Sequence, residues 1–255
     1  MRWRGLIAVI EFRNIRKAFG DKVVLDDVSL TVGTGSILFI VGISGAGKSV
    51  LVKHLVGLLR PDAGRVLLDG VDVTDLSEKA FYPVRKKCAM VFQHSTLFDS
   101  MTLCENVMLP LRKHRGLDAA AARQEAMRYL EMVQMHDEAD RFPADIGDGL
   151  RKRVAIARAL TQSPEYVIFD EPTTGLDPLA APHVDRLIRS LSDDHGVTSI
   201  VVSHDLRSIF GVADRIAMLY RGNIHLDGTP EAFRESTDPI VRQFIRGLAD
   251  GPMVL

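Results

Sequence analysis

Short apolar runs, separated by turns that contain Gly and Asp, predict the first strands of the fold. They lie at 7–12, 23–32, 36–41 and 66–68. Two later runs, at 166–169 and 199–202, are almost wholly apolar. Such strands are typical of a parallel sheet that is covered on both faces. The pattern therefore predicts a sheet with buried central strands.

Helical periodicity appears between and after these strands. One helix is expected to begin at 47–49, directly after a strand, and a second over about 118–134. The stripe over 183–191 predicts a crossover helix between two parallel strands. A short amphipathic helix is predicted from 238 onward. The alternation predicts an α/β fold in which 118–134 belongs to an inserted helical layer.

The turn between the strand at 36–41 and the following helix matches the pattern G-x-x-x-x-G-K-[ST]. Its residues are Gly42, Ile43, Ser44, Gly45, Ala46, Gly47, Lys48 and Ser49. Glycines allow successive backbone N–H groups to turn toward a phosphate, and the helix N-terminus adds partial positive charge. We therefore predict that Lys48 bridges the β- and γ-phosphates of a nucleotide and that the Ser49 hydroxyl coordinates Mg²⁺.

A pair of carboxylates, Asp170 and Glu171, ends the buried strand at 166–169. By itself such a pair is often only a helix cap. Beside a phosphate loop, Asp170 is a candidate for holding Mg²⁺ through water, and Glu171 is a candidate general base for the attacking water. Together the two motifs predict nucleotide hydrolysis.

Composition narrows the class of protein. The 255 residues carry a formal net charge of -1, which gives no global field toward nucleic acid or an anionic membrane. The two cysteines, Cys88 and Cys104, have neither CxxC spacing nor a metal-type cluster around them. No run of about 18 apolar residues occurs, so we expect membrane association only through a partner.

Over nearly its whole length the chain resembles the ATP-binding subunit of an ABC transporter. Phe19 matches the aromatic residue that stacks on adenine in that family, and Gln93 matches the Q-loop residue that senses Mg²⁺ and the attacking water. Asp177 lies in a segment, 173–178, that resembles the D-loop crossing between two subunits. His204 matches the switch histidine that contacts the γ-phosphate. Outside this context, a lone Phe before a turn is usually a core residue.

The resemblance implies a P-loop NTPase (RecA-like) core with an antiparallel β subdomain and an inserted α-helical subdomain. It implies ATP and Mg²⁺ as ligands, with the metal held by Ser49, Gln93 and Asp170. Catalysis is implied for Glu171, His204 and Gln93. The implied divisions are a core of 1–92 with 164–230, a helical subdomain of 93–163, and a C-terminal helix and tail of 231–255.

The chain departs from the family at the signature L-S-G-G-[QM]. The corresponding residues are Ile146, Gly147, Asp148, Gly149 and Leu150, so a serine hydroxyl is lost and a carboxylate is gained. In the family, this element of one subunit binds the γ-phosphate held by the other subunit. We expect weakened ATP-driven dimer closure and reduced hydrolysis, because like charges repel at short range. Gly-Asp-Gly also suits a helix entry, so the fold is expected to survive.

Three stretches resemble a narrower group, the ATPase subunits of Mce-type phospholipid transporters. They are 95–102, 105–112 and 150–153. The tail 241–252 is the most particular match to this group. The implied partners are a second copy of the chain, two integral-membrane permease subunits, an Mce-type lipid-binding protein and a small STAS-type protein, with no nucleic acid. The implied location is the cytoplasmic face of the inner membrane, reached through the permease. In this group the tail reaches the neighbouring subunit; the alternative is packing on its own core.

Two other functions stay open. One is an ABC ATPase with different cargo, such as an amino-acid or export transporter, because nothing in the chain is expected to touch the transported molecule. The other is a nucleotide-gated regulatory subunit that closes weakly and hydrolyses little. Glu171 favours catalysis, whereas Asp148 favours the regulatory reading.

Overall fold

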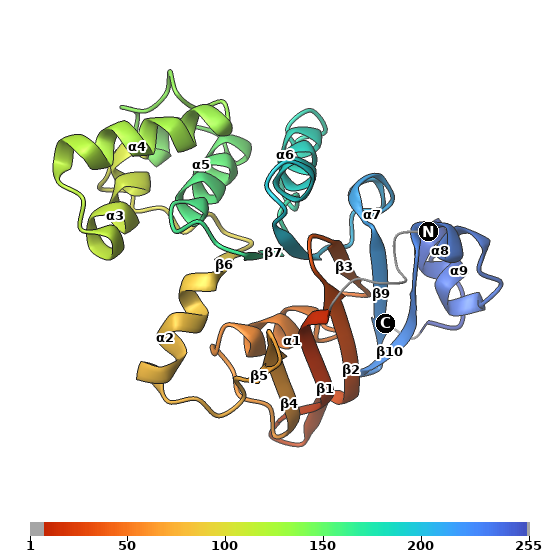
Figure 1. Cartoon of the computed structure of the whole chain (residues 1–255). Helices are drawn as coiled ribbons and strands as arrows, with labels where there is room; N and C mark the ends of the chain where they lie inside the picture. The colour runs from red at the N-terminus through yellow and green to blue at the C-terminus, as the bar shows by residue number, and fades with distance from the viewer. Residues whose placement is uncertain (1–7, 254–255) are drawn as a thin grey trace.

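The computed structural model describes residues 8–253, which form two sheets and three groups of helices (Figure 1). The strands are β1 (Ala8–Phe19), β2 (Lys22–Gly33), β3 (Ile37–Val41), β4 (Ala63–Leu68), β5 (Val71–Asp72), β6 (Cys88–Val91), β7 (Tyr166–Asp170), β8 (Thr198–Val202), β9 (Arg215–Tyr220) and β10 (Asn223–Gly228). The helices are α1 (Lys48–Leu55), α2 (Glu78–Lys87), α3 (Leu103–Arg115), α4 (Ala119–Met132), α5 (Asp148–Leu160), α6 (Ala181–Asp193), α7 (Leu206–Val212), α8 (Pro230–Glu235) and α9 (Pro239–Arg246), with a short 3-10 turn at Pro143–Asp145.

The larger sheet has six strands in the order β10-β9-β3-β8-β7-β6. All neighbouring pairs except β9 with β10 are parallel. Every residue of β3, β7 and β8 is buried, as the continuous apolar runs predicted. Because the strands are parallel, the loops after β3, β8, β7 and β6 all leave from one edge of the sheet.

The smaller sheet is antiparallel, with the order β2-β1-β4-β5. The strand predicted at 7–12 continues to Phe19, and its first residue, Ile7, lies outside the described residues. A register shift between Phe12 and Ile15 interrupts the apolar alternation, and Asn14 there has a φ of 50°. This bulge returns Ile15 to the core, which is why the alternation alone ended the strand too early.

Helices α3, α4 and α5 share a separate apolar core. The predicted helix over 118–134 is α4, which begins after an Asp118 cap and ends at Met132. Ala126 and Leu130 of this helix are fully buried, and Val133 is buried just beyond its end. This helical layer stands beside the end of the larger sheet formed by β6 and β7 (Figure 1).

Several elements were not anticipated from the sequence, among them α2, α3, α7 and β9. Thr102 and Glu105 form a reciprocal cap at the start of α3. Buried Asn106 in that helix accepts from the Phe98 N–H at 2.8 Å and donates toward the Phe98 carbonyl. The side chain of Asn106 therefore holds the stretch before α3 against the helical layer.

The C-terminal segment packs on its own core. Val241 of α9 and Met253 beyond it are buried in the core around β3 and β9. The buried Gln243 side chain accepts from the Met253 N–H at 2.7 Å and so fastens the returning chain to α9. Within this chain, the segment up to Met253 therefore packs on its own core, and contact of the tail with a neighbouring subunit stays a prediction.

No helix within residues 8–253 combines the length and the apolar character needed to cross a bilayer.

Candidate nucleotide-binding site

The phosphate loop joins β3 to α1, as its pattern predicted. Gly42 and Gly47 have positive φ values of 147° and 101°. A Cβ on Gly42 would run into the carbonyl oxygen of Leu219, and one on Gly47 would come within 2.9 Å of Leu25. Glycine is therefore required at both positions by backbone conformation and by packing. The N-cap Gly47 offers no side-chain cap, which leaves the first N–H groups of α1 available to an anion.

The Lys48 ammonium is buried inside this loop. It donates to the carbonyls of Gly42 at 2.9 Å and Ile43 at 3.0 Å. Burial lowers the pKa of Lys48 from its ordinary value, and the charges of Glu171 and Asp170 oppose that shift. A phosphate entering the loop supplies a stronger acceptor than either neutral carbonyl, so the lysine is placed to exchange these bonds for a phosphate.

Ser49 and Asp170 meet at the start of α1. The Ser49 hydroxyl donates to Asp170 Oδ1 at 2.6 Å across 121 residues of sequence. A hydroxyl and a carboxylate beside a phosphate-binding loop are the hard oxygen ligands that Mg²⁺ takes in nucleotide sites. Within residues 8–253, no group of three or more His, Cys, Asp or Glu side chains is placed so that it could hold a metal ion.

Glu171 and His204 are brought together from the ends of β7 and β8. His204 Nδ1 lies 2.9 Å from Glu171 Oε2, and the Thr174 hydroxyl donates to the same oxygen at 2.8 Å. The Glu171 backbone has a φ of 51°, in the left-handed region, while its N–H donates to the Val202 carbonyl at 2.9 Å. Such a conformation costs on the order of 1–3 kcal/mol and is held by its surroundings. Its effect is to turn the Glu171 carboxylate toward the histidine.

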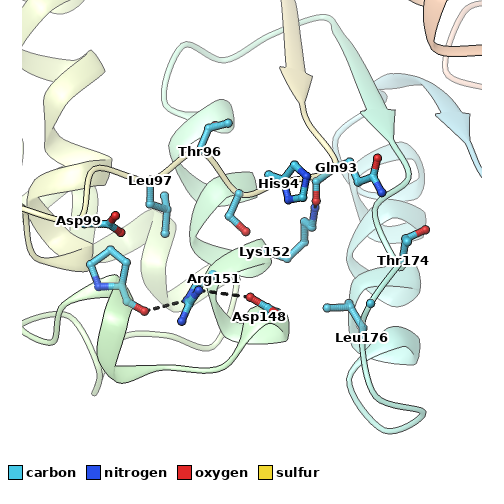
Figure 2. A pocket seen from close by; sticks show the side chains of 13 residues that line it. Gln93, His94, Thr96, Leu97, Asp99, Asp148, Arg151, Lys152, Thr174 and Leu176 are labelled. Atoms are coloured by element: carbon cyan, nitrogen blue, oxygen red, sulfur yellow. Dashed lines mark hydrogen bonds and ion pairs between the residues drawn. The ribbon is translucent and has the colours of Figure 1, made fainter.

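Gln93 follows β6 at the same edge, but its neighbours belong to a different part of the site. It lines a cavity of about 360 Å³ together with Asp148, Arg151 and Leu176 (Figure 2). The Gln93 side chain is exposed and makes no hydrogen bond to Ser49 or Asp170. The structure therefore joins two of the three predicted metal ligands directly and places the third beside the signature loop.

The signature loop forms the entry to α5. Gly147 is the N-cap and Asp148 the first helical residue, so the carboxylate sits at the positive end of the helix. Asp148 Oδ1 lies 3.3 Å from Arg151 Nη1 (Figure 2). Arg151 also donates to the carbonyls of Pro143 and Ile146. A Cβ on Gly149 would come within 2.8 Å of the Ala180 methyl, whereas one on Gly147 would meet open space.

Lys152 is a site residue that the sequence reasoning missed. Its ammonium donates to the carbonyls of Phe92 at 2.9 Å and Gln93 at 2.5 Å and thereby ties α5 to the segment after β6. The side chain is only 2% exposed, and burial lowers its pKa to about 8. Within Arg151-Lys152-Arg153 it resembles a solvated basic run. The available signal was its helical spacing with buried Ala155 and Ile156.

Phe19 and Asp177 are the remaining two predicted binding residues. Phe19 ends β1 and is 49% exposed, with Lys17 Nζ 5.5 Å from the ring centroid. The Asp177 carboxylate accepts from the N–H groups of Leu179 and Ala180, both at 2.9 Å. The alternative interpretation of Phe19 was a core residue, and an exposed ring at the end of β1 does not fit it. Asp177 shapes the turn that leads into α6.

These features define a class of protein. A glycine-rich loop at the carboxyl edge of a parallel sheet, with a serine–aspartate pair beside it, is the site of a P-loop nucleotide-binding protein. The antiparallel sheet and the inserted helical layer set this P-loop protein apart from a simple α/β domain.

Comparisons with known proteins agree with this class. Residues 25–174 match the sequence model of the ABC transporter family. The chain is 37% identical over 245 residues to the intermembrane phospholipid transport system ATP-binding protein MlaF of Escherichia coli (strain K12), covering 96% of this chain and 91% of that protein. It is 36% identical over 244 residues to the probable ribonucleotide transport ATP-binding protein Mkl of Mycobacterium leprae (strain TN), covering 96% of this chain and 70% of that protein.

The fold is also found in solved structures. One similar structure is the dimeric post-hydrolysis state of the ATP-binding cassette MJ0796 bound to ADP and Pi, with a TM-score of 0.79 and 30% identity. The match covers 87% of this chain and 98% of that one. The chain belongs to the ABC transporter family, as an ATP-binding subunit with ATPase activity.

Proposed function

We propose that this chain hydrolyses ATP to power phospholipid transport between an inner and an outer membrane. The observation that supports the chemistry is the convergence of the Ser49–Asp170 and Glu171–His204 pairs at one edge of the sheet. The cargo is inferred from likeness to a protein named for intermembrane phospholipid transport, 91% of whose length is matched. The match to the protein named for ribonucleotide transport covers a smaller share of that protein.

In the proposed reaction, Glu171 accepts a proton from the water that attacks the γ-phosphate. Its carboxylate is 12% exposed and already holds one oxygen against His204 and Thr174, which fixes its direction. His204 is 60% exposed and contacts the γ-phosphate with its free ring nitrogen. Gln93 completes the arrangement when the segment after β6 approaches the phosphates.

The residues that bind ATP are those of the phosphate loop, Gly42 to Ser49, with Phe19 stacking on adenine. Mg²⁺ would be held by Ser49 and Asp170, with Gln93 joining them. When bound, the metal neutralises developing charge on the phosphate oxygens. Lys48 adds a positive charge at the β- and γ-phosphates, and burial strengthens its effect there.

We further propose that each site is completed by a second copy of the chain. The signature loop Gly147, Asp148 and Gly149 of one copy faces the phosphate loop of the other, and Asp177 crosses at the same interface. Residues 93–163 form a helical subdomain that moves relative to a core of 1–92 and 164–230, while 231–255 is a C-terminal addition. The ion pair of Asp148 with Arg151 offsets part of the charge that Asp148 adds.

The proposed assembly contains two copies of the chain beneath two permease subunits at the cytoplasmic face of the inner membrane. An Mce-type lipid-binding protein and a small STAS-type protein complete it. The test is purification of the chain from membranes solubilised in mild detergent, followed by identification of the bound protein and extractable lipid. Recovery with a permease and phospholipid is the expected result. Recovery with an amino-acid permease and no enriched phospholipid contradicts the cargo.

A second function, a nucleotide-gated regulatory subunit, is favoured by one observation, the carboxylate of Asp148 at the helix entry. The two functions differ in phosphate release by the purified complex. ATP-dependent dimerisation without phosphate release above that of the Lys48→Ala variant favours the regulatory subunit. Release that depends on Glu171 favours the transport ATPase.

A further inference from the structure

A second concave site lies between the helical layer and the core, on α5 one turn beyond Gly149. It is a cavity of about 250 Å³ between the end of α4, one side of α5 and the first turns of α6. These helices lie next to one another in the upper part of Figure 1. The lining residues are Met132, Val133, Gln134, Arg153, His183, Arg186, Leu187 and Ser190. The lining thus holds two arginines and a histidine and contains no Asp or Glu.

The two arginines of this cavity are not held in ion pairs, although the charge of Arg186 acts on the neighbouring Asp185 carboxylate. Neither Arg153 nor Arg186 forms an ion pair with a carboxylate of the described residues. Arg189, one turn further along α6, is paired with both Asp193 and Asp214. Burial and, after it, the charge of Arg186 lower the pKa of Arg153. Two guanidinium groups that line one cavity and lack ion-pair partners attract an anion.

His183 adds a directed donor to the pair. Arg186 Nη2 lies 2.9 Å from His183 Nδ1. A guanidinium has no acceptor, so Nδ1 accepts and the neutral ring carries its proton on Nε2. Burial lowers the pKa of His183, and the charges of Arg153 on α5 and Arg186 on α6 lower it further. The end of α4 brings no charged side chain into the lining.

We propose that this cavity binds a small phosphate-type anion between Arg153, Arg186 and the Nε2–H of His183. Planar guanidinium groups suit the oxygens of a phosphate, which accept several hydrogen bonds at once. The volume is below that of most drug-sized ligand pockets, which favours inorganic phosphate or a short phosphate monoester over a nucleotide. The bound anion would link α5 of the helical layer to α6 of the core. This proposal does not depend on the transported cargo.

The test is an NMR titration of the His183 ring in the full chain carrying Lys48→Ala, so that phosphate at the glycine-rich loop does not contribute. Inorganic phosphate is added at constant ionic strength, with chloride as the reference salt, and His183→Gln assigns the signal. The expected result is a saturable rise in the pKa of His183, because a bound anion favours the protonated ring. Arg186→Ala is expected to weaken the apparent affinity about 10- to 100-fold.

Matched variants keep the proposal falsifiable. Arg242 on α9 is exposed and has no carboxylate partner among residues 8–253, so Arg242→Ala is the control and leaves the affinity unchanged. Arg153→Lys keeps the charge but loses the planar fork and is expected to bind more weakly than the parent chain. A second titration uses glycerol 3-phosphate. Tighter binding of inorganic phosphate indicates a site for free phosphate, and tighter binding of glycerol 3-phosphate indicates a site for a phosphate monoester.

A His183 pKa that is the same in chloride, phosphate and glycerol 3-phosphate overturns the proposal. Equal affinities in the Arg186→Ala and Arg242→Ala variants overturn it as well. In that case the arginines serve only the carbonyl end of α4, which has no basic residue of its own in its last turn.

Discussion

The edge of the larger sheet and the entry to α5 are built in different ways, although both are expected to face nucleotide. At the edge, Asp170 follows the fully buried strand β7 and meets Ser49 from a distant part of the chain. At the entry to α5, the side chain of Asp148 is 73% exposed and pairs with Arg151, three residues away. The edge is fixed by the core, whereas the entry is fixed by local contacts.

The difference shows where this chain tolerates chemical change. A substitution at Asp170 disturbs a pair on which two core elements converge. A Gly-Asp-Gly entry in place of the family signature leaves α5 intact, because its buried face rests on Val154, Ile156 and Ala157 rather than on the loop. The proposed catalytic groups are therefore constrained by folding, and the loop proposed to face a second copy is constrained mainly by function.

The largest expected effect comes from breaking the edge. Glu171→Gln removes the general base while keeping the size of the side chain, and we expect phosphate release to fall about 10²- to 10⁴-fold. ATP binding is retained, because Lys48 and Ser49 are untouched. Phosphate release and nucleotide binding are measured side by side. The control is Glu165→Gln, which alters an exposed carboxylate just before β7. Wild-type turnover in Glu171→Gln rules out the proposed base.

Repairing the entry to α5 is the next test. Gly147→Ser with Asp148→Gly restores a hydroxyl donor and removes a carboxylate, and the open space around Gly147 accommodates the serine. A hydrogen bond to a charged group contributes about 1.5–3 kcal/mol, so we expect turnover of the assembled transporter to rise about 10- to 100-fold. Asp137→Gly, which removes an exposed carboxylate elsewhere in the helical layer, is the control. Equal rates before and after repair remove the claim that this loop limits catalysis.

Gly149 and Gly147, at the same entry, differ in how closely they are packed. Gly149→Ala places a methyl group 2.8 Å from that of Ala180, so α5 and α6 must separate, at a cost of about 1–2 kcal/mol in the free energy of unfolding. Gly147→Ala meets open space and is expected to change this free energy by less than about 0.5 kcal/mol. Urea unfolding of the two variants measures the contrast. Equal losses would show that α5 and α6 adapt freely.

The last test concerns Lys152, which ties α5 to the segment after β6 and whose effect appears only as a dependence on pH. Its folded pKa of about 8 lies below the ordinary value of 10.5, so between these pH values the unfolded chain binds more protons. Unfolding free energy therefore gains from this lysine as pH rises through that window, by at most about 1.4 kcal/mol per pH unit. The unfolding free energies of wild type and Lys152→Met are measured by denaturation across this pH window, and the difference between their pH dependences gives the contribution of Lys152. Identical pH dependence in both proteins contradicts the assignment.

The sequence predicted much of the nucleotide edge because its residues are close together within short motifs. The phosphate loop, Asp170 and the buried strands β7 and β8 carry strong local patterns, and the structure has them where the patterns indicated. Their roles in catalysis remain predictions. The bulge at Asn14 and the continuation of β1 were missed, because pairing with β2 and β4 overrides the apolar alternation there.

Local order along the chain was enough to determine the α/β class, the phosphate loop and the departure at Gly147 and Asp148. Those features depend on residue identity and on periods of two or about three and a half residues, which are written in the sequence itself. Only the tertiary structure decided that Glu171 meets His204, that Lys152 holds the carbonyl of Gln93, and that Arg153, Arg186 and His183 share a cavity without a carboxylate. Each depends on which elements pack together. Contacts between residues far apart in the sequence produce no periodic pattern of residue types, so the sequence alone does not predict them.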